Sequence, residues 1–172
     1  MRRIKYFVAN SLDGFISRRD GSVEWLFTDQ DYGMTEFFGS VDVVVMGRKT
    51  HDKMLELAPK QPFYPGMKNY VFTRTKPPGI RDGVEFVSTD VESWAEGVRG
   101  ESGKDIWLVG GGDLVRHFLE KRLVNEIGLA IHPRLLGDGI PLFPPPFPET
   151  VLELLRFKHY PTGLVQIFYG VK

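Results

Sequence analysis

Apolar runs of two kinds alternate along the chain, and they predict strands and helices in turn. Runs rich in valine, isoleucine and aromatic residues predict strands at 4–11, 41–47, 68–74, 84–88, 105–112 and 125–133. Apolar residues at helical spacing predict helices at 31–40, 50–58, 89–100 and 113–123. Two last apolar runs, 151–160 and 163–171, flank the turn residues 161–163 and predict a closing β-hairpin.

This order of elements predicts an α/β fold with a mostly parallel sheet, helices on both faces and an antiparallel edge made by the closing hairpin. The strand 41–47 is apolar almost throughout, which is typical of a strand covered on both faces. The proline-rich segment 141–150 is followed only by the hairpin, which is too short for a second domain. We therefore expect one domain over residues 1–172.

The composition excludes several classes of function. Lys plus Arg and Asp plus Glu each number 22, so general attraction to nucleic acid or to an anionic membrane is not expected. The chain has no cysteine, and its four histidines lack the spacing of metal ligands, so no metal site is expected. No run approaches the roughly 18 apolar residues of a membrane span, and the N-terminal stretch does not have the pattern of a signal peptide. These features favour a cytoplasmic protein.

The strand-to-helix turns are the first place to search for function, because ligands of open parallel sheets bind beyond the carboxyl ends of the strands. The stretch VVVMGRKTHDKM, residues 43–54, runs from a buried strand through Gly47 to Arg48, Lys49 and Thr50. Free amides and the dipole at a helix start attract phosphate, and two cations and a hydroxyl would strengthen that attraction. The alternative is that both cations are merely solvated and Thr50 only caps the helix.

Two further turns carry similar signals. Gly110, Gly111 and Gly112 join a buried strand to an amphipathic helix, and such a run indicates forced backbone angles or close contact with a ligand. Val115 stands where the dinucleotide fingerprint needs another glycine, so a tight turn without a ligand is the alternative. Thr73 and Arg74 lie just past another strand end, where an arginine can bind the 2′-phosphate of NADP.

These residues resemble a known superfamily. The stretch VVVMGRKTHDKM is similar to the NADPH-binding turn of dihydrofolate reductase. The stretches NSLDGFIS and WLVGGGDLVRHFLEKRLVNEIGLAIHPRLLGDGIPLF resemble more closely the reductase domain of the riboflavin-pathway deaminase-reductase, the RibD C-terminal type. The resemblance runs from about Arg3 to Phe143 and includes the terminal hairpin in outline. The zinc deaminase half of that bifunctional protein has no counterpart in this chain.

The resemblance implies a dihydrofolate reductase-like three-layer fold with NADPH as the hydride donor. The cofactor residues that it implies are Ala9, Ile16, Gly47, Arg48, Lys49, Thr50, Thr73, Arg74, Gly110, Gly111, Gly112, Asp113 and Leu114. On the substrate side it implies Gly137, Asp138, Gly139 and Ile140. Trp25 either forms a wall of the substrate pocket or belongs to the core.

The proton donor is less well defined. Dihydrofolate reductase carries an acidic residue on its first helix, and Asp31 is the nearest match, with Asp29 and Glu36 as alternatives. Each of these acids could instead cap or solvate the helix. Asp13 is a second candidate, because its segment borders the cofactor and substrate in the riboflavin-type reductases, although Asp13 and Gly14 could form only a turn.

We therefore expect an NADPH-dependent reductase that transfers a hydride to a small heterocyclic or sugar-linked substrate of pyrimidine or pterin type. A nucleotide-binding protein without turnover is the main alternative, and an unrelated α/β ligand-binding module is the third. Aromatic residues of the closing hairpin favour a homodimer; they are Phe157, Tyr160, Phe168 and Tyr169.

Overall fold

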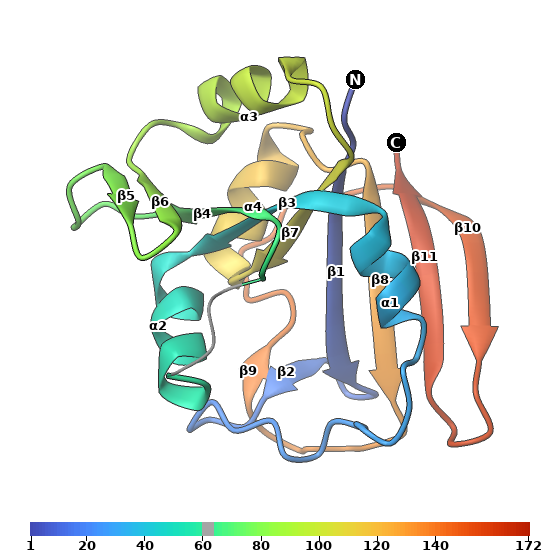
Figure 1. The fold of residues 1–172 in the computed structure, drawn as a ribbon. Coiled ribbons are helices and arrows are strands. Elements are labelled where there is room, and N and C mark those ends of the chain that lie inside the picture. Colours follow the sequence, from blue (N-terminus) through green and yellow to red (C-terminus); the bar gives the residue numbers. More distant parts are fainter. Residues whose placement is uncertain (60–63) are drawn as a thin grey trace.

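The computed structural model describes residues 1–59 and 64–172, which form a nine-stranded sheet, a small two-stranded ribbon and four helices (Figure 1). The strands are β1 (Ile4–Ser11), β2 (Phe15–Ser17), β3 (Val41–Gly47), β4 (Lys68–Phe72), β5 (Gly79–Arg81), β6 (Val84–Val87), β7 (Asp105–Gly110), β8 (Glu126–His132), β9 (Ile140–Pro141), β10 (Leu152–His159) and β11 (Val165–Val171). The helices are α1 (Met34–Gly39), α2 (Arg48–Leu57), α3 (Val91–Gly100) and α4 (Gly112–Glu120).

The order of strands in the large sheet is β10-β11-β8-β1-β7-β3-β4-β6-β5. The six central strands from β8 to β6 are parallel to one another, whereas β11 is antiparallel to β8 and β5 to β6. The carboxyl ends of β1, β7 and β3 therefore lie side by side at one edge of the sheet. This architecture confirms the predicted mostly parallel sheet with an antiparallel C-terminal hairpin.

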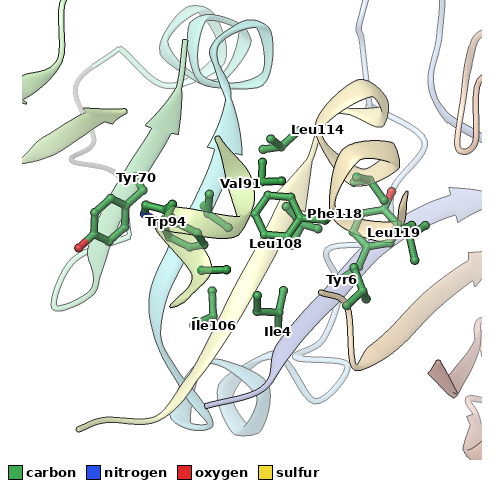
Figure 2. Packing of buried hydrophobic residues seen from close by; sticks show 14 of the residues in the cluster. Ile4, Tyr6, Tyr70, Val91, Trp94, Ile106, Leu108, Leu114, Phe118 and Leu119 are labelled. Atoms are coloured by element: carbon green, nitrogen blue, oxygen red, sulfur yellow. The ribbon is translucent and has the colours of Figure 1, made fainter. Parts of the chain in front are cut away.

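The sheet is covered on both faces, and alternate residues of the central strands supply two separate cores. Val43 and Val45 pack in one core with α3 and α4, and Val44 and Met46 pack in the other with side chains of α1 and α2. In the first core Trp94 of α3 packs against Tyr70 and Phe118 (Figure 2). Trp94 also packs against Phe72. Burial on both faces explains why β3 is apolar at every position except Asp42 and Gly47.

Some element boundaries differ from those predicted. Helix α2 begins at Arg48 rather than at Thr50, because Gly47 is the last extended residue and the chain turns into the helix directly after it. Helix α3 begins as expected, with the Asp90 side chain accepting a hydrogen bond of 2.9 Å from Ser93 N. None of the helices in the described residues is long and apolar enough to cross a membrane.

Candidate functional site

The two predicted strand-to-helix turns meet at the carboxyl edge of the sheet. Strands β3 and β7 are neighbours, so Gly47 at the end of one lies beside Gly111 at the end of the other. A Cβ atom on Gly47 would lie 3.7 Å from Gly111 N and 3.9 Å from Leu114 Cβ. A Cβ atom on Gly111 would lie 3.3 Å from Thr50 Oγ1. The two turns therefore approach each other closely, which glycine at both positions allows.

Both helices that start at this edge have glycine as the N-cap residue. Neither Gly47 before α2 nor Gly111 before α4 provides a side-chain oxygen to the first-turn amides, whereas Asp90 does so for α3. Uncapped first-turn amides carry a partial positive charge and are suited to an anion. The backbone of Gly110 has φ = 131°, a value that other residues rarely adopt, which explains why glycine stands in this turn.

Asp52 pairs with two cations, Arg48 of α2 and Lys76 of the loop after β4. Arg48 Nη1 donates to Asp52 Oδ2 at 2.6 Å, and Lys76 Nζ lies 3.7 Å from Asp52 Oδ1. The His51 ring nitrogen Nδ1 is 3.1 Å from the same Oδ1. Burial opposes the ionisation of Asp52, but hydrogen bonds from His51 and Arg48 outweigh it and hold the pKa of the carboxyl below its usual value. The carboxylate therefore joins α2 to the loop after β4.

Thr73 shapes that loop. Its side chain is buried, and its Oγ1 accepts hydrogen bonds from the backbone amides of Thr75 at 3.2 Å and Lys76 at 3.1 Å. Arg74, which stands between Thr73 and Thr75, is exposed two residues past the end of β4. Arg74 and Lys76 thus share one short loop, and Lys76 of that loop lies beside Asp52 of α2.

Asp13 links the end of β1 to the loop that was predicted to face the substrate. Its carboxylate accepts hydrogen bonds from Ser11 Oγ at 2.6 Å, Gly137 N at 2.7 Å and Leu136 N at 3.1 Å. The Ser11 hydroxyl, and then these backbone amides, lower the pKa of Asp13 below its ordinary value of 3.8. Asp13 is therefore a charged anchor near neutral pH, and this geometry does not favour it as an acid.

The predicted substrate loop is fastened to β2 as well. Asp138 pairs with Arg19, and a Cβ atom on Gly139 would overlap with the carbonyl oxygen of Ser17. Ile140 begins the short strand β9, which pairs with β2, and its side chain is 42% exposed. The loop is held in place while Ile140 remains accessible.

Asp31, the predicted proton donor, lies two residues before Gly33, the N-cap of α1, and binds Thr35 in the first turn of that helix. Its Oδ1 accepts hydrogen bonds from Thr35 Oγ1 at 2.7 Å and Thr35 N at 3.0 Å, and these bonds lower its pKa. Asp29 accepts a hydrogen bond of 2.7 Å from the Tyr32 hydroxyl. The catalytic role of Asp31 stays a prediction, and its hydrogen bonds with Thr35 favour the alternative that it stabilises the start of the helix.

An aromatic group lies beside the ends of β1 and β8. Trp25, which is 4% exposed, packs edge-on against His132 with ring centroids 5.3 Å apart. Phe27 N donates to His132 Nε2 at 3.1 Å, so the other ring nitrogen carries the proton and donates to Ala130 O at 3.1 Å. Burial lowers the pKa of His132, which keeps the ring neutral. Among the described residues, Trp25 Nε1 and Asn10 Oδ1 are buried without a hydrogen-bond partner.

The remaining predicted cofactor residues lie on β1, on β2 and at the starts of α2 and α4. Ala9 is the third residue from the carboxyl end of β1. Ile16 lies in β2 and packs against the first core. Lys49 and Asp113 stand in the first turns of α2 and α4. A Cβ atom on Gly112 would lie 2.6 Å from Pro144 Cγ, so the start of α4 also packs against the proline-rich segment.

Sequence comparison assigns the chain to a family. The profile of the RibD C-terminal domain matches residues 2–166, which is nearly the whole chain. The chain belongs to the RibD C-terminal domain family. The resemblance found in the motifs is thereby confirmed.

Three relatives of this RibD C-terminal domain illustrate its range. The uncharacterized protein YyaP of Bacillus subtilis (strain 168) is 34% identical over 178 residues, which cover 98% of this chain and 94% of YyaP. The crystal structure of a Shewanella sp. PV-4 protein, provisionally assigned to riboflavin biosynthesis, is 26% identical, with a TM-score of 0.84 and 99% of both chains covered. The Thermotoga maritima diaminohydroxyphosphoribosylaminopyrimidine deaminase/5-amino-6-(5-phosphoribosylamino)uracil reductase shares the fold at 14% identity, with a TM-score of 0.76; the match covers 99% of this chain and 57% of that one.

Three residues near the site of this RibD C-terminal domain were not predicted from the sequence. Asp52 stands four residues after Arg48, and this spacing is typical of ion pairs on a helix. Lys76 follows Arg74 by two residues, which is only a weak indication that both cations belong to one site. Asn10 is a polar residue at the end of an otherwise apolar strand. The meaning of each depended on contacts that only the fold supplies.

Proposed function

We propose that this protein is an NADPH-dependent reductase that transfers a hydride to a small heterocyclic or sugar-linked substrate of pyrimidine or pterin type. The observation that carries the proposal is the meeting of Gly47 and Thr50 with Gly111 and Leu114 between two uncapped helix starts. Membership of the RibD C-terminal domain family supports a reductase, and the Thermotoga relative is by description a deaminase joined to a 5-amino-6-(5-phosphoribosylamino)uracil reductase. NADPH would supply the hydride when bound.

The residues around the two turns fit a dinucleotide. The first-turn amides of α2 and α4 would bind the diphosphate, with Arg48 and Lys49 supplying charge and Thr50 a hydroxyl. Thr73 and Arg74 would face the 2′-phosphate of the adenosine. Because Asp52 holds Arg48 in place, less side-chain entropy would be lost when an anion binds.

The substrate would lie on the side of Trp25 and of the loop from Gly137 to Ile140, which Asp13 holds against the end of β1. The chain would act mainly by positioning the two reactants and by excluding water. Both Asp13 and Asp31 have lowered pKa values, so an ordered water is a better source of the proton than either carboxyl.

The second candidate is a nucleotide-binding protein without turnover. It is favoured by the same two carboxylates, because each is committed to hydrogen bonds that stabilise its charged form. The two candidates share the cofactor site and differ only in whether a proton reaches the substrate.

The test begins with calorimetric titration of the protein with NADPH and with NADH. We expect NADPH to bind more tightly, and Arg48→Ala to weaken NADPH binding by roughly tenfold, the loss of one charge-assisted contact of about 1.4 kcal/mol. Lys104→Ala is the matched control, because Lys104 is an exposed cation near the opposite edge of the sheet. Equal affinities of Arg48→Ala and the unaltered protein would show the cofactor assignment to be wrong.

Turnover is measured separately, as the decrease of NADPH absorbance with aminopyrimidine ribosyl phosphate, pterin and quinone substrates. Oxidation of NADPH with one of them supports the reductase. Tight binding of NADPH without oxidation by any substrate of these classes favours the second candidate.

We also propose that the protein is a homodimer that pairs through β10. All residues of this edge strand are exposed, among them Leu154 (55%) and Phe157 (66%). An exposed apolar edge strand is avoided in monomers because its free backbone groups pair readily with another strand. The partner proposed here is a second copy of β10, because Glu153 of one strand can lie opposite Lys158 of the other in an antiparallel pair.

A further inference from the structure

A cavity of about 420 Å³ lies behind helix α2, between that helix and the β5–β6 hairpin. Its walls on the helix side are His51 and Leu55, which stand four residues apart on one face of α2. Pro77, Val84 and Phe86 supply the rest of its apolar surface. The volume falls within the range of about 300–1,000 Å³ that is common for small-molecule sites.

The cavity is separate from the candidate cofactor site. Its residue Phe86 belongs to the core on the α1 and α2 face of the sheet, and the next residue in β6, Val87, belongs to the core on the α3 and α4 face. Leu114, which lies beside Gly47 at the cofactor turns, packs on that second face. The ring of Phe86 therefore faces away from the side on which Leu114 packs.

Two cations stand over this apolar surface. Lys76 Nζ lies 5.0 Å from the centroid of the Phe86 ring, and Arg81 Cζ lies 5.3 Å from it. Arg81 Nη1 also donates to Pro77 O at 3.0 Å, which fixes its guanidinium at the rim. Among the described residues that line the cavity, Asp82 is the one carboxylate, and it stands with two cations, Lys76 and Arg81.

We propose that this cavity binds a small organic anion with an apolar body, such as an aromatic carboxylate. The apolar body would lie against Leu55, Val84 and Phe86, and the carboxylate would accept hydrogen bonds from Lys76 and Arg81 at the rim. A purely apolar ligand would leave both cations without an anionic partner in the cavity, and inorganic phosphate would leave the apolar walls uncovered. The chemistry of the lining therefore selects a ligand that has both parts.

The proposal does not depend on the proposed reductase activity, but one contact links the two regions. Lys76 lies 3.7 Å from Asp52, whose carboxylate also holds Arg48. An anion that draws Lys76 toward the cavity removes one of the partners of Asp52, and so acts on the first turn of α2.

The test uses benzoate as the probe, with benzamide as its neutral counterpart of nearly the same shape and inorganic phosphate as an anion without an apolar body. Binding to the full chain is measured from ¹H–¹⁵N chemical-shift changes. We expect benzoate to shift the amides of Leu55, Val84 and Phe86 with a dissociation constant on the order of 1 mM. Benzamide and phosphate are expected to bind at least about tenfold more weakly.

Two variants and a control complete the test. The double variant Lys76→Ala with Arg81→Ala is expected to weaken benzoate binding about tenfold or more, and Leu55→Trp, at a position already 39% exposed, is expected to block it by filling the cavity. Lys121→Ala is the control: it removes an exposed cation that pairs with Glu92 of α3 and does not line the cavity. This variant is expected to bind benzoate like the unaltered protein. Equal binding of benzoate and benzamide, equal binding of benzoate and phosphate, or unchanged binding in the double variant would overturn the proposal.

Discussion

Thr50 and Gly111 meet across the two turns at the carboxyl edge of the sheet: Thr50 Oγ1 lies 3.3 Å from the place that a Cβ atom on Gly111 would occupy. One residue belongs to the first turn of α2 and the other is the N-cap of α4. Helices that are distant in sequence thus start side by side, and their first turns pack closely because neither Gly47 nor Gly111 has a side chain. A small addition at Gly111 should therefore affect a ligand more than the fold.

Gly111→Ala is expected to weaken NADPH binding roughly tenfold while costing less than about 1.5 kcal/mol of stability. The backbone of Gly111 (φ = −73°, ψ = −177°) suits alanine, so only the methyl contact with Thr50 and with the ligand changes. Calorimetric titration and urea unfolding measure the two effects. In the control Gly97→Ala, the methyl enters open space on α3; it should leave the affinity unchanged and raise stability by about 0.5–1 kcal/mol. Unchanged NADPH affinity in Gly111→Ala would contradict close approach of the cofactor at this turn.

The sequence was sufficient to predict the main strands, because their apolar patterns are long and their burial is nearly complete. Strand β3 is the clearest case, since four consecutive residues from Val43 to Met46 are fully buried. The short strands β2, β5 and β9 were not predicted. Strands of two or three residues have no readable periodicity, and they form only because a partner lies beside them.

The candidate site was predictable where its residues are close in sequence. Gly47 to Thr50 and Gly110 to Leu114 carry their signal locally, as glycines and polar residues at the end of an apolar strand. The contact between Asp13 and Gly137 joins residues 124 positions apart, and no local pattern shows that the carboxylate would be used as an anchor. The acids assigned to catalysis were the least predictable, because a carboxylate that caps, anchors or donates a proton looks the same in a sequence.

Asp13→Asn is expected to lower the thermal stability near neutral pH, because the neutral amide accepts weaker hydrogen bonds from Ser11, Leu136 and Gly137. The folded-state pKa of Asp13 lies below its ordinary value of 3.8, so the stabilisation is present above that value and is lost as the pH falls through the folded-state pKa. The difference in melting temperature between the two proteins should therefore narrow at acid pH. A difference that stays constant from neutral to acid pH would show that the charge of Asp13 is not responsible.

The same variant also examines catalysis. If Asp13 only anchors the loop, Ser11→Ala should reproduce part of the effect of Asp13→Asn on the KM of the substrate, because it removes one hydrogen bond of the same anchor. A lower kcat with unchanged KM in Asp13→Asn, together with an unchanged kcat in Ser11→Ala, would instead indicate that Asp13 is a catalytic acid.

His132 is expected to make the fold sensitive to mild acid. The ring is 3% exposed, and burial lowers its pKa below the ordinary 6.5, so the unfolded chain takes up the proton first. Stability should therefore fall as the pH drops below about 6.5, until the folded-state pKa is passed. His132→Gln cannot titrate; it should be less stable near neutral pH and lose a smaller part of its stability on acidification. Urea midpoints at several pH values measure how steeply the stability of each protein falls with pH. An equal fall in the unaltered protein and in His132→Gln would exclude His132 as the cause of the acid sensitivity.

The pattern of β10 fits a second copy of itself. The strand has an irregularity between Leu154 and Arg156 in its pairing with β11, which places Leu154 and Phe157 toward one face and Glu153 and Lys158 toward the other. An antiparallel pair of β10 strands centred on this irregularity would oppose Leu154 to Phe157 and Glu153 to Lys158. The first pairing buries apolar surface, and the second brings together opposite charges twice, once on each side of the two-fold axis.

Lys158→Glu is therefore expected to weaken the dimer about tenfold, because it places like charges opposite each other at both ends of the strand pair. Glu153→Lys combined with Lys158→Glu reverses both charges and should restore the affinity, whereas either change alone should not. Sedimentation equilibrium over a range of concentrations measures the dissociation constant of each protein. A restored double variant would distinguish this register from a dimer held only by apolar contact, for which the charge reversals would act independently and add.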